Sequence, residues 1–65
     1  MDSSAIAALA YDAAARRLSI RFRSGQAYGY AEVAPSVFAA FLAADSKGRF
    51  FHAEIDGRYA YRRLS

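Results

Sequence analysis

The segment Arg17–Arg23 alternates strictly between apolar and polar side chains, and it constrains the fold more than any other part of the sequence. Leu18, Ile20 and Phe22 stand at every second position, and arginine or serine fills the positions between them. Because successive side chains of a β-strand point to opposite faces, this pattern predicts a strand with one apolar face and one cationic face.

The residues after this strand predict a hairpin. Gly25 supplies the positive φ that a tight turn needs, and a third strand is expected over Ala27–Val33. A two-residue loop of Ser24 and Gly25 places Tyr28 and Tyr30 on the cationic face. A three-residue loop that also includes the preceding arginine places both tyrosines on the apolar face. The three-residue loop is favoured because the other register lines the core with only alanine and glycine, but both registers remain open.

Shorter signals predict the remaining elements, which are a first strand over Ile6–Tyr11, a helix opened by Pro35, a second helix over Lys47–Ile55 and a closing strand over Arg58–Leu64. Asp12 is expected to bind backbone N–H groups in the first turn, Asp45 or Ser46 to cap the second helix, and Gly57 to end it. The order β-β-β-α-α-β predicts an α+β fold: a small twisted antiparallel sheet with the helices packed on one face.

The first helix is predicted to have two different faces. Its apolar stripe consists of Val37, Phe38, Phe41 and Leu42. The opposite side carries Ala39, Ala40 and Ala43 instead of charged residues. Such a face is typical of a well-propagating helix, and it is also compatible with a homodimer contact.

Composition limits the domain count and the kinds of site. With 65 residues, 55% of them hydrophobic, the chain is predicted to form a single domain over residues 1–65. It has no cysteine and one histidine, so neither disulfides nor a structural metal site is expected. The N-terminus lacks a basic signal-peptide region and no apolar run is long enough to cross a membrane, so a cytoplasmic location is predicted.

The charged residues favour an anionic partner over catalysis. The formal net charge is +3, and eight of the nine basic residues are arginine, which binds phosphate well. Arg17, Arg21 and Arg23 are expected on the outer side of one strand, and Arg58 and Arg62 on that of the closing strand. If these strands lie close together, their guanidinium groups form one stripe that engages phosphates without reading sequence.

Three further segments can each be interpreted either as part of a binding site or as part of the structure. Ser46-Lys47-Gly48-Arg49 at a helix start can hold a phosphate, or it can simply cap and pack the helix. The pairs Tyr28-x-Tyr30 and Tyr59-x-Tyr61 can stack on bases, or they can pack a core. His52 has no nucleophile or paired carboxylates around it in the sequence and is expected at the surface, so the chain is predicted not to be an enzyme and to need no cofactor.

An ordered set of residues resembles the KTSC domain family. They are Tyr11-Asp12, Leu18-x-Ile20-x-Phe22, Gly25, Tyr28-x-Tyr30, Val33, Ser36-Val37-Phe38, Ser46-x-Gly48-x-Phe50-Phe51, Ile55 and Arg58-Tyr59-x-Tyr61-Arg62. That family is named for a segment at the C-terminus of some lysyl-tRNA synthetases, and it also occurs as small free-standing bacterial and phage proteins. The resemblance implies no established activity, and the synthetase attachment suggests RNA binding.

The chain departs from the family pattern at four positions. Pro35 lies one residue later than expected, His52 replaces a usual asparagine, Asp56 a usual basic residue, and Ala60 a usual proline. The change at Asp56 removes a positive charge next to the closing strand.

The sequence therefore predicts a non-catalytic module that binds RNA or another single-stranded nucleic acid. The residues expected to bind it are Arg21, Arg23, Tyr28, Tyr30, Lys47, Arg49, Arg58, Tyr61 and Arg62. The alternative is a protein-interaction or self-association module with no role in nucleic-acid binding. No membrane partner is expected.

Overall fold

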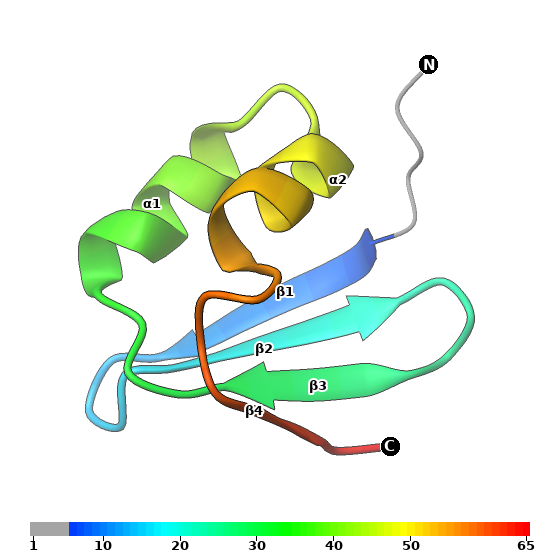
Figure 1. Ribbon diagram of the computed structural model, residues 1–65, viewed down its shortest axis with the longest axis horizontal. Helices are drawn as coiled ribbons and strands as arrows, with labels where there is room; N and C mark the ends of the chain where they lie inside the picture. The colour runs from blue at the N-terminus through cyan, green and yellow to red at the C-terminus, as the bar shows by residue number, and fades with distance from the viewer. Residues whose placement is uncertain (1–5) are drawn as a thin grey trace.

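The computed structural model describes residues 6–65 and has the predicted order of elements. Strands β1 (Ile6–Asp12), β2 (Arg17–Phe22), β3 (Ala27–Tyr30) and β4 (Tyr61–Arg63) form one antiparallel sheet in the order β1-β2-β3-β4. Helix α1 (Pro35–Ala43), helix α2 (Lys47–Phe50) and the π-helical turn η1 (Phe51–Ile55) all lie on one side of this sheet, as Figure 1 shows. The α+β class is thus confirmed.

The hairpin between β2 and β3 has the favoured three-residue loop. Phe22 N–H donates to the Gln26 carbonyl at 2.8 Å, and Gly25 N–H donates to the Phe22 carbonyl at 2.9 Å, with Gly25 at a φ of 101°. Ile20 consequently pairs with Tyr28, so the apolar face of β2 and the tyrosines of β3 share the side that faces the helices. The opposite side of β2 remains cationic.

The core fills the space between this side of the sheet and the helical layer. Its buried members are Leu18, Ile20, Tyr30, Val33, Phe41, Phe51 and Ile55. The Tyr11 ring stacks on Phe38 with 4.9 Å between ring centroids, and the Tyr11 hydroxyl donates to the Val33 carbonyl. This contact fastens β1 to the start of α1. Asp12 accepts bonds from the N–H groups of two turn alanines, as predicted.

Strand β3 is shorter than expected. It ends at Tyr30 instead of Val33, because Glu32 adopts a positive φ of 59° and turns the chain toward α1. Val33 N–H then donates to the Arg16 carbonyl at 2.9 Å instead of joining the sheet.

Helix α1 begins with Pro35 in its first turn, as expected. The predicted apolar stripe is too wide, however, because Leu42 is 53% exposed while its neighbour Phe41 is fully buried. The sheet covers a narrower arc of this helix than the sequence pattern suggested.

The second helical segment runs from Lys47 to Ile55 as predicted, but its last turn is π-helical. Asp56 N–H donates to the Phe51 carbonyl at 2.8 Å across five residues. Gly57, at a φ of 79°, then ends the segment. The Ser46 hydroxyl caps its start by accepting a bond from Arg49 N–H at 3.2 Å.

Strand β4 starts at Tyr61, so the predicted start of the closing strand at Arg58 is wrong. Arg58 N–H instead donates to the Ile55 carbonyl at 3.0 Å, in a turn directly after η1. The chain first reaches the sheet where Ala31 N–H donates to the Ala60 carbonyl at 2.9 Å. Strand β4 lies beside β3 at one edge of the sheet, a position that the sequence left open.

Candidate nucleic-acid interface

The side of the sheet opposite the helices carries three arginines from two strands, and no other element of residues 6–65 covers it (Figure 1). Arg17 and Arg21 project from β2 on the side opposite Leu18 and Ile20. Arg62 lies on the same side of β4, because it pairs with Gly29, which itself pairs with Ser19. We call this surface, defined by Arg17, Arg21 and Arg62, the arginine face.

Small residues keep the arginine face shallow. A hollow of about 280 Å³ lies on it, with Ala8, Ala10, Ser19, Arg21, Ala27, Leu64 and Ser65 among its lining residues. The side chains of Arg17 and Leu64 lie beside Gly29, since a Cβ built there would be in ordinary van der Waals contact with Arg17 Cδ at 3.5 Å and Leu64 Cδ1 at 3.4 Å. The stem of Arg17 therefore lies across β3, toward the strand that carries Arg62. Arg17 Cδ thus lies beside Gly29, the residue that pairs with Arg62.

Among residues 6–65, no ion pair joins these arginines to a carboxylate. In the part of the chain that the structure describes, the one ion pair joins His52 Nδ1 to Asp56 Oδ2 at 3.6 Å, and it lies on the helical layer. Asp12 is opposite Arg17 in the sheet, but its Oδ1 accepts two backbone bonds in the turn. Three guanidinium groups on a low-relief surface, without an ion pair to a carboxylate in residues 6–65, form an arrangement suited to a phosphate backbone.

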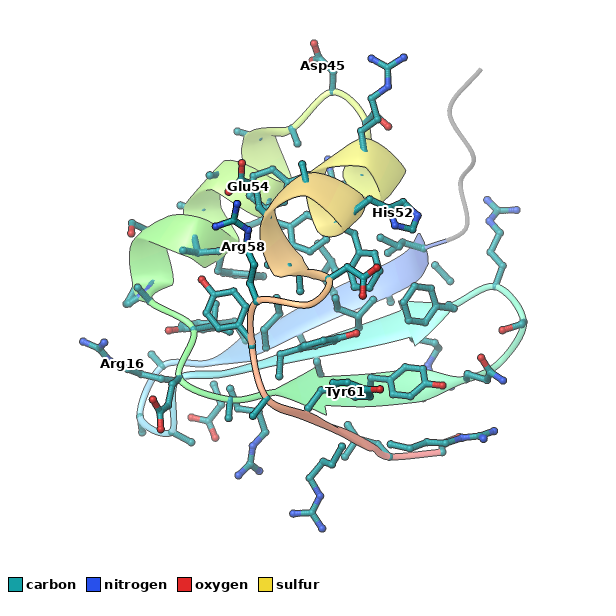
Figure 2. All side chains as sticks on the ribbon, in the orientation of Figure 1. Arg16, Asp45, His52, Glu54, Arg58 and Tyr61 are labelled. Carbon is teal, nitrogen blue, oxygen red and sulfur yellow. The ribbon has the colours of Figure 1, made fainter. Side chains whose placement is uncertain are left out.

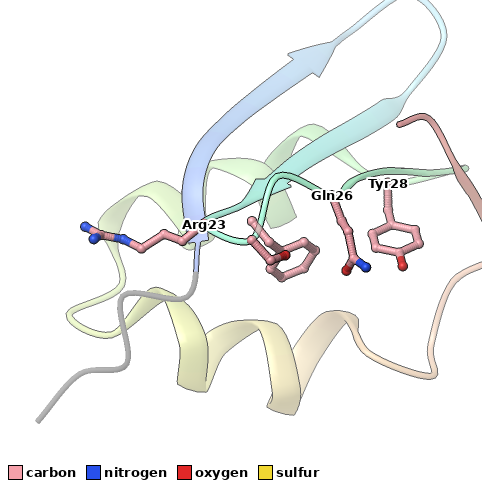
Figure 3. A pocket seen from close by; sticks show the side chains of 5 residues that line it. Arg23, Gln26 and Tyr28 are labelled. Carbon is pink, nitrogen blue, oxygen red and sulfur yellow. The ribbon is translucent and has the colours of Figure 1, made fainter.

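Arg23 lies at the end of the β2–β3 hairpin, beyond the last residue of β2. It lines a second hollow of about 300 Å³ together with Phe22, Ser24, Gln26 and Tyr28. In Figure 3 its side chain points away from Gln26 and Tyr28, which both point toward the helical layer. Arg23 thus lies at the end of the hairpin, where it lines this hollow.

The other three predicted cations are not on the arginine face. Lys47 Nζ donates to the carbonyls of Leu42 at 3.1 Å and Ala44 at 2.8 Å, so this ammonium caps the end of α1. Arg49 is exposed on α2. Arg58 Nε donates to the Ala53 carbonyl at 3.2 Å, and Figure 2 shows this side chain beside the helical turn, near Glu54.

The predicted convergence of five arginines is therefore only partly correct. In the Ser46–Arg49 segment, Ser46 and Lys47 bind backbone groups and Gly48 is buried, as the structural interpretation expects.

The tyrosines lie on the opposite side of the sheet from the arginine face. Tyr30 is only 5% exposed, so the expectation that it offers an edge for base stacking is wrong. Its ring centroid lies 5.6 Å from that of Tyr61 and 6.0 Å from that of Phe51. Tyr61 is 64% exposed at the sheet edge (Figure 2), and Tyr28 is half-buried. Stacking on the arginine face itself is thus excluded for all three rings.

The environment of Tyr30 also changes its acidity. Burial, and then the nearby carboxylate of Asp56 and the phenols of Tyr61 and Tyr28, raise the pKa of Tyr30 from 10.0 to about 12. Each of these groups disfavours the negative phenolate. The Tyr30 hydroxyl is therefore neutral at physiological pH and acts as part of the core.

Sequence reasoning missed the contributions of Gln26 and Phe22 to the hairpin hollow. Gln26 carries no motif signal, and Phe22 is part of the apolar face of β2, so only the three-residue loop brings them together. Within residues 6–65 there is no group of three or more His, Cys, Asp or Glu side chains arranged to hold a metal ion. No helix in this range is long and apolar enough to cross a membrane.

Comparisons with known proteins agree on one family. Residues 2–59 match the KTSC domain. A protein of Tsukamurella paurometabola is 46% identical over 59 residues, which cover 91% of this chain and 88% of that protein. A lysine–tRNA ligase of Nostoc punctiforme is 36% identical over 64 residues, 98% of this chain but only 11% of the ligase. The crystal structure of a KTSC domain protein from Yersinia pestis has a TM-score of 0.91 at 38% identity, and the match covers 100% of this chain and 92% of that one.

Proposed function

The chain belongs to the KTSC domain family, and on that premise we propose that it is a non-catalytic module that binds the phosphate backbone of nucleic acid on its arginine face. The observation that supports this function best is the gathering of Arg17, Arg21 and Arg62 on a side of the sheet that no other element of the described residues covers, with no ion pair to a carboxylate. Contacts between arginine and phosphate supply affinity that does not depend on the nucleotide sequence.

RNA is the nucleic acid to test first. One relative is by name a lysine–tRNA ligase, a protein that acts on tRNA, and a segment of it resembles nearly the whole of this chain. Long arginine side chains on a shallow floor suit phosphates that are spaced along a flexible backbone. The module acts in this proposal as a binding surface, and no group on it takes part in bond breaking.

The double variant Arg21→Ala/Arg62→Ala tests this function. Each lost phosphate contact should lower the slope of log affinity against log salt by about 0.7, so the slope for a short single-stranded RNA should fall by about 1.4. The affinity at 0.1 M salt should then fall about 25-fold, as measured by fluorescence anisotropy over a salt series.

The variant Arg49→Ala/Arg58→Ala is the matched control, because it removes the same charge from the helical layer. Its affinity should change by about twofold or less, since screening weakens interactions at that distance. Equal losses in the two double variants would mean that net charge, and not the arginine face, governs binding. If Arg21→Ala/Arg62→Ala binds RNA as tightly as the wild type does, the assignment of RNA binding to the arginine face is refuted.

A second candidate function is self-association through α1, and the exposure of Leu42 favours it. This side chain is 53% exposed beside the exposed Ala39, Ala40 and Ala43, which together form an uncharged apolar surface. Sedimentation velocity over a concentration series should then show a dimer, and Leu42→Glu should return the protein to a monomer. A wild-type chain that stays monomeric over the whole series would refute this candidate.

A further inference from the structure

The hollow at the end of the β2–β3 hairpin combines aromatic walls with unengaged polar groups. The half-buried rings of Phe22 and Tyr28 meet edge to face, with 5.9 Å between centroids and 72° between planes. Arg23, Ser24 and Gln26 complete the lining of this hollow of about 300 Å³ (Figure 3). No side-chain hydrogen bond within the described residues involves the amide of Gln26 or the guanidinium of Arg23.

These groups match the chemistry of a nucleobase. An aromatic wall stacks on the flat face that every base has, and a glutamine amide both donates to and accepts from the polar edge of a base. The volume lies at the lower end of the roughly 300–1,000 Å³ typical of small-ligand pockets, which suits one base and not a base pair. No carboxylate is among the lining residues, and Arg23 gives the rim a positive charge that complements a phosphate.

The hollow lies on the other side of the sheet from the arginine face, and Arg23 lines it at the end of the hairpin. Arg23 follows Arg21 by two residues, and its side chain points away from Gln26 and Tyr28 at the end of the hairpin (Figure 3). A chain whose phosphates contact Arg21 and then Arg23 turns around the hairpin, and its next base reaches the rings of Phe22 and Tyr28. A base held in a duplex cannot enter without unpairing.

We infer, on the basis of the proposed function, that the hairpin hollow binds one unpaired base of a single-stranded nucleic acid whose backbone lies on the arginine face. Phe22 and Tyr28 supply the stacking surface, and Gln26 contacts the edge of the base. The arginine face supplies affinity for the backbone, whereas the hollow selects single strands over duplexes.

The experiment compares a short single-stranded oligonucleotide with a chain of the same length made of abasic sugar-phosphate units. Tyr28→Leu should weaken binding of the base-bearing strand about 5- to 150-fold, the loss that follows from about 1–3 kcal/mol per stacked base. It should leave the affinity for the abasic chain unchanged. Gln26→Ala, a change at an exposed residue, should also weaken only the base-bearing strand.

Tyr61→Leu is the matched control, because it removes a more exposed ring that does not line the hollow. This variant should bind both ligands as the wild type does. If the wild type binds both ligands equally and Tyr28→Leu and Gln26→Ala change neither affinity, the base site is refuted while the arginine face remains supported. If the wild type binds neither ligand, the proposed function fails together with the base site.

Discussion

Replacing Phe41 by alanine should cost the domain about 3–5 kcal/mol of unfolding free energy, the usual loss for a fully buried phenylalanine. The Phe41 side chain is 0% exposed, and its ring stacks on that of Phe50 with 4.8 Å between centroids. A chain of 65 residues is expected to have roughly 3–10 kcal/mol of stability in total, so this one change removes a large part of it. Urea denaturation followed by circular dichroism measures the loss.

The neighbouring residue provides the control for this prediction. Leu42→Ala changes a side chain that is 53% exposed, and it should cost less than about 1 kcal/mol. Similar losses for Phe41→Ala and Leu42→Ala would contradict the packing of α1 against the sheet described above.

The domain should lose about 2 kcal/mol of stability as the pH rises from 10 to 12, because of Tyr30 alone. Its pKa is about 12 in the folded protein against 10.0 for an unperturbed phenol. Below pH 10 the hydroxyl is protonated in both the folded and the unfolded chain, so the full stability is present. Between these two values the unfolded chain releases the proton while the folded chain keeps it, and unfolding becomes more favourable.

Tyr30→Phe isolates this effect, because it keeps the ring and removes the ionisable group. The unfolding free energy of the wild type, measured by urea denaturation over this pH range, should fall more steeply than that of Tyr30→Phe. The difference in unfolding free energy between the two proteins should change by about 2 kcal/mol in favour of the variant. Parallel curves would show that the phenol of Tyr30 is not held in the buried, negatively charged surroundings that the structure gives it.

The elements that the sequence predicted correctly are those fixed by local chemistry. Gly25 fits the positive φ of a three-residue loop, Pro35 suits a first helical turn, and Gly57 ends the second helical segment. The alternation of apolar and polar side chains along β2 distinguishes the cationic face from the core face without any knowledge of tertiary contacts. Those two faces, together with the hairpin register, account for the position of Arg21 in the candidate site.

The features that the sequence missed depend on tertiary structure. Arg58 was expected on the closing strand because Arg58–Leu64 alternates, but the π-helical turn η1 and the turn after it delay the start of the strand until Tyr61. Lys47 looked like a phosphate ligand, and only the packing of α1 against α2 shows that its ammonium binds the end of α1. The place of β4 beside β3 is likewise a long-range pairing that no local pattern specifies.

The strand order of the sheet indicates which strand should unfold first. Strands β1, β2 and β3 are joined by short turns, whereas β4 reaches β3 only after the helical segment. Closing a loop of about thirty residues costs about 2 kcal/mol more entropy than closing one of about four. The meander should therefore form early in folding, and the three-residue β4 should detach first under stress. Because β4 carries Arg62, partial unfolding should disperse the arginines of the proposed phosphate-binding face while the hydrophobic core is still intact.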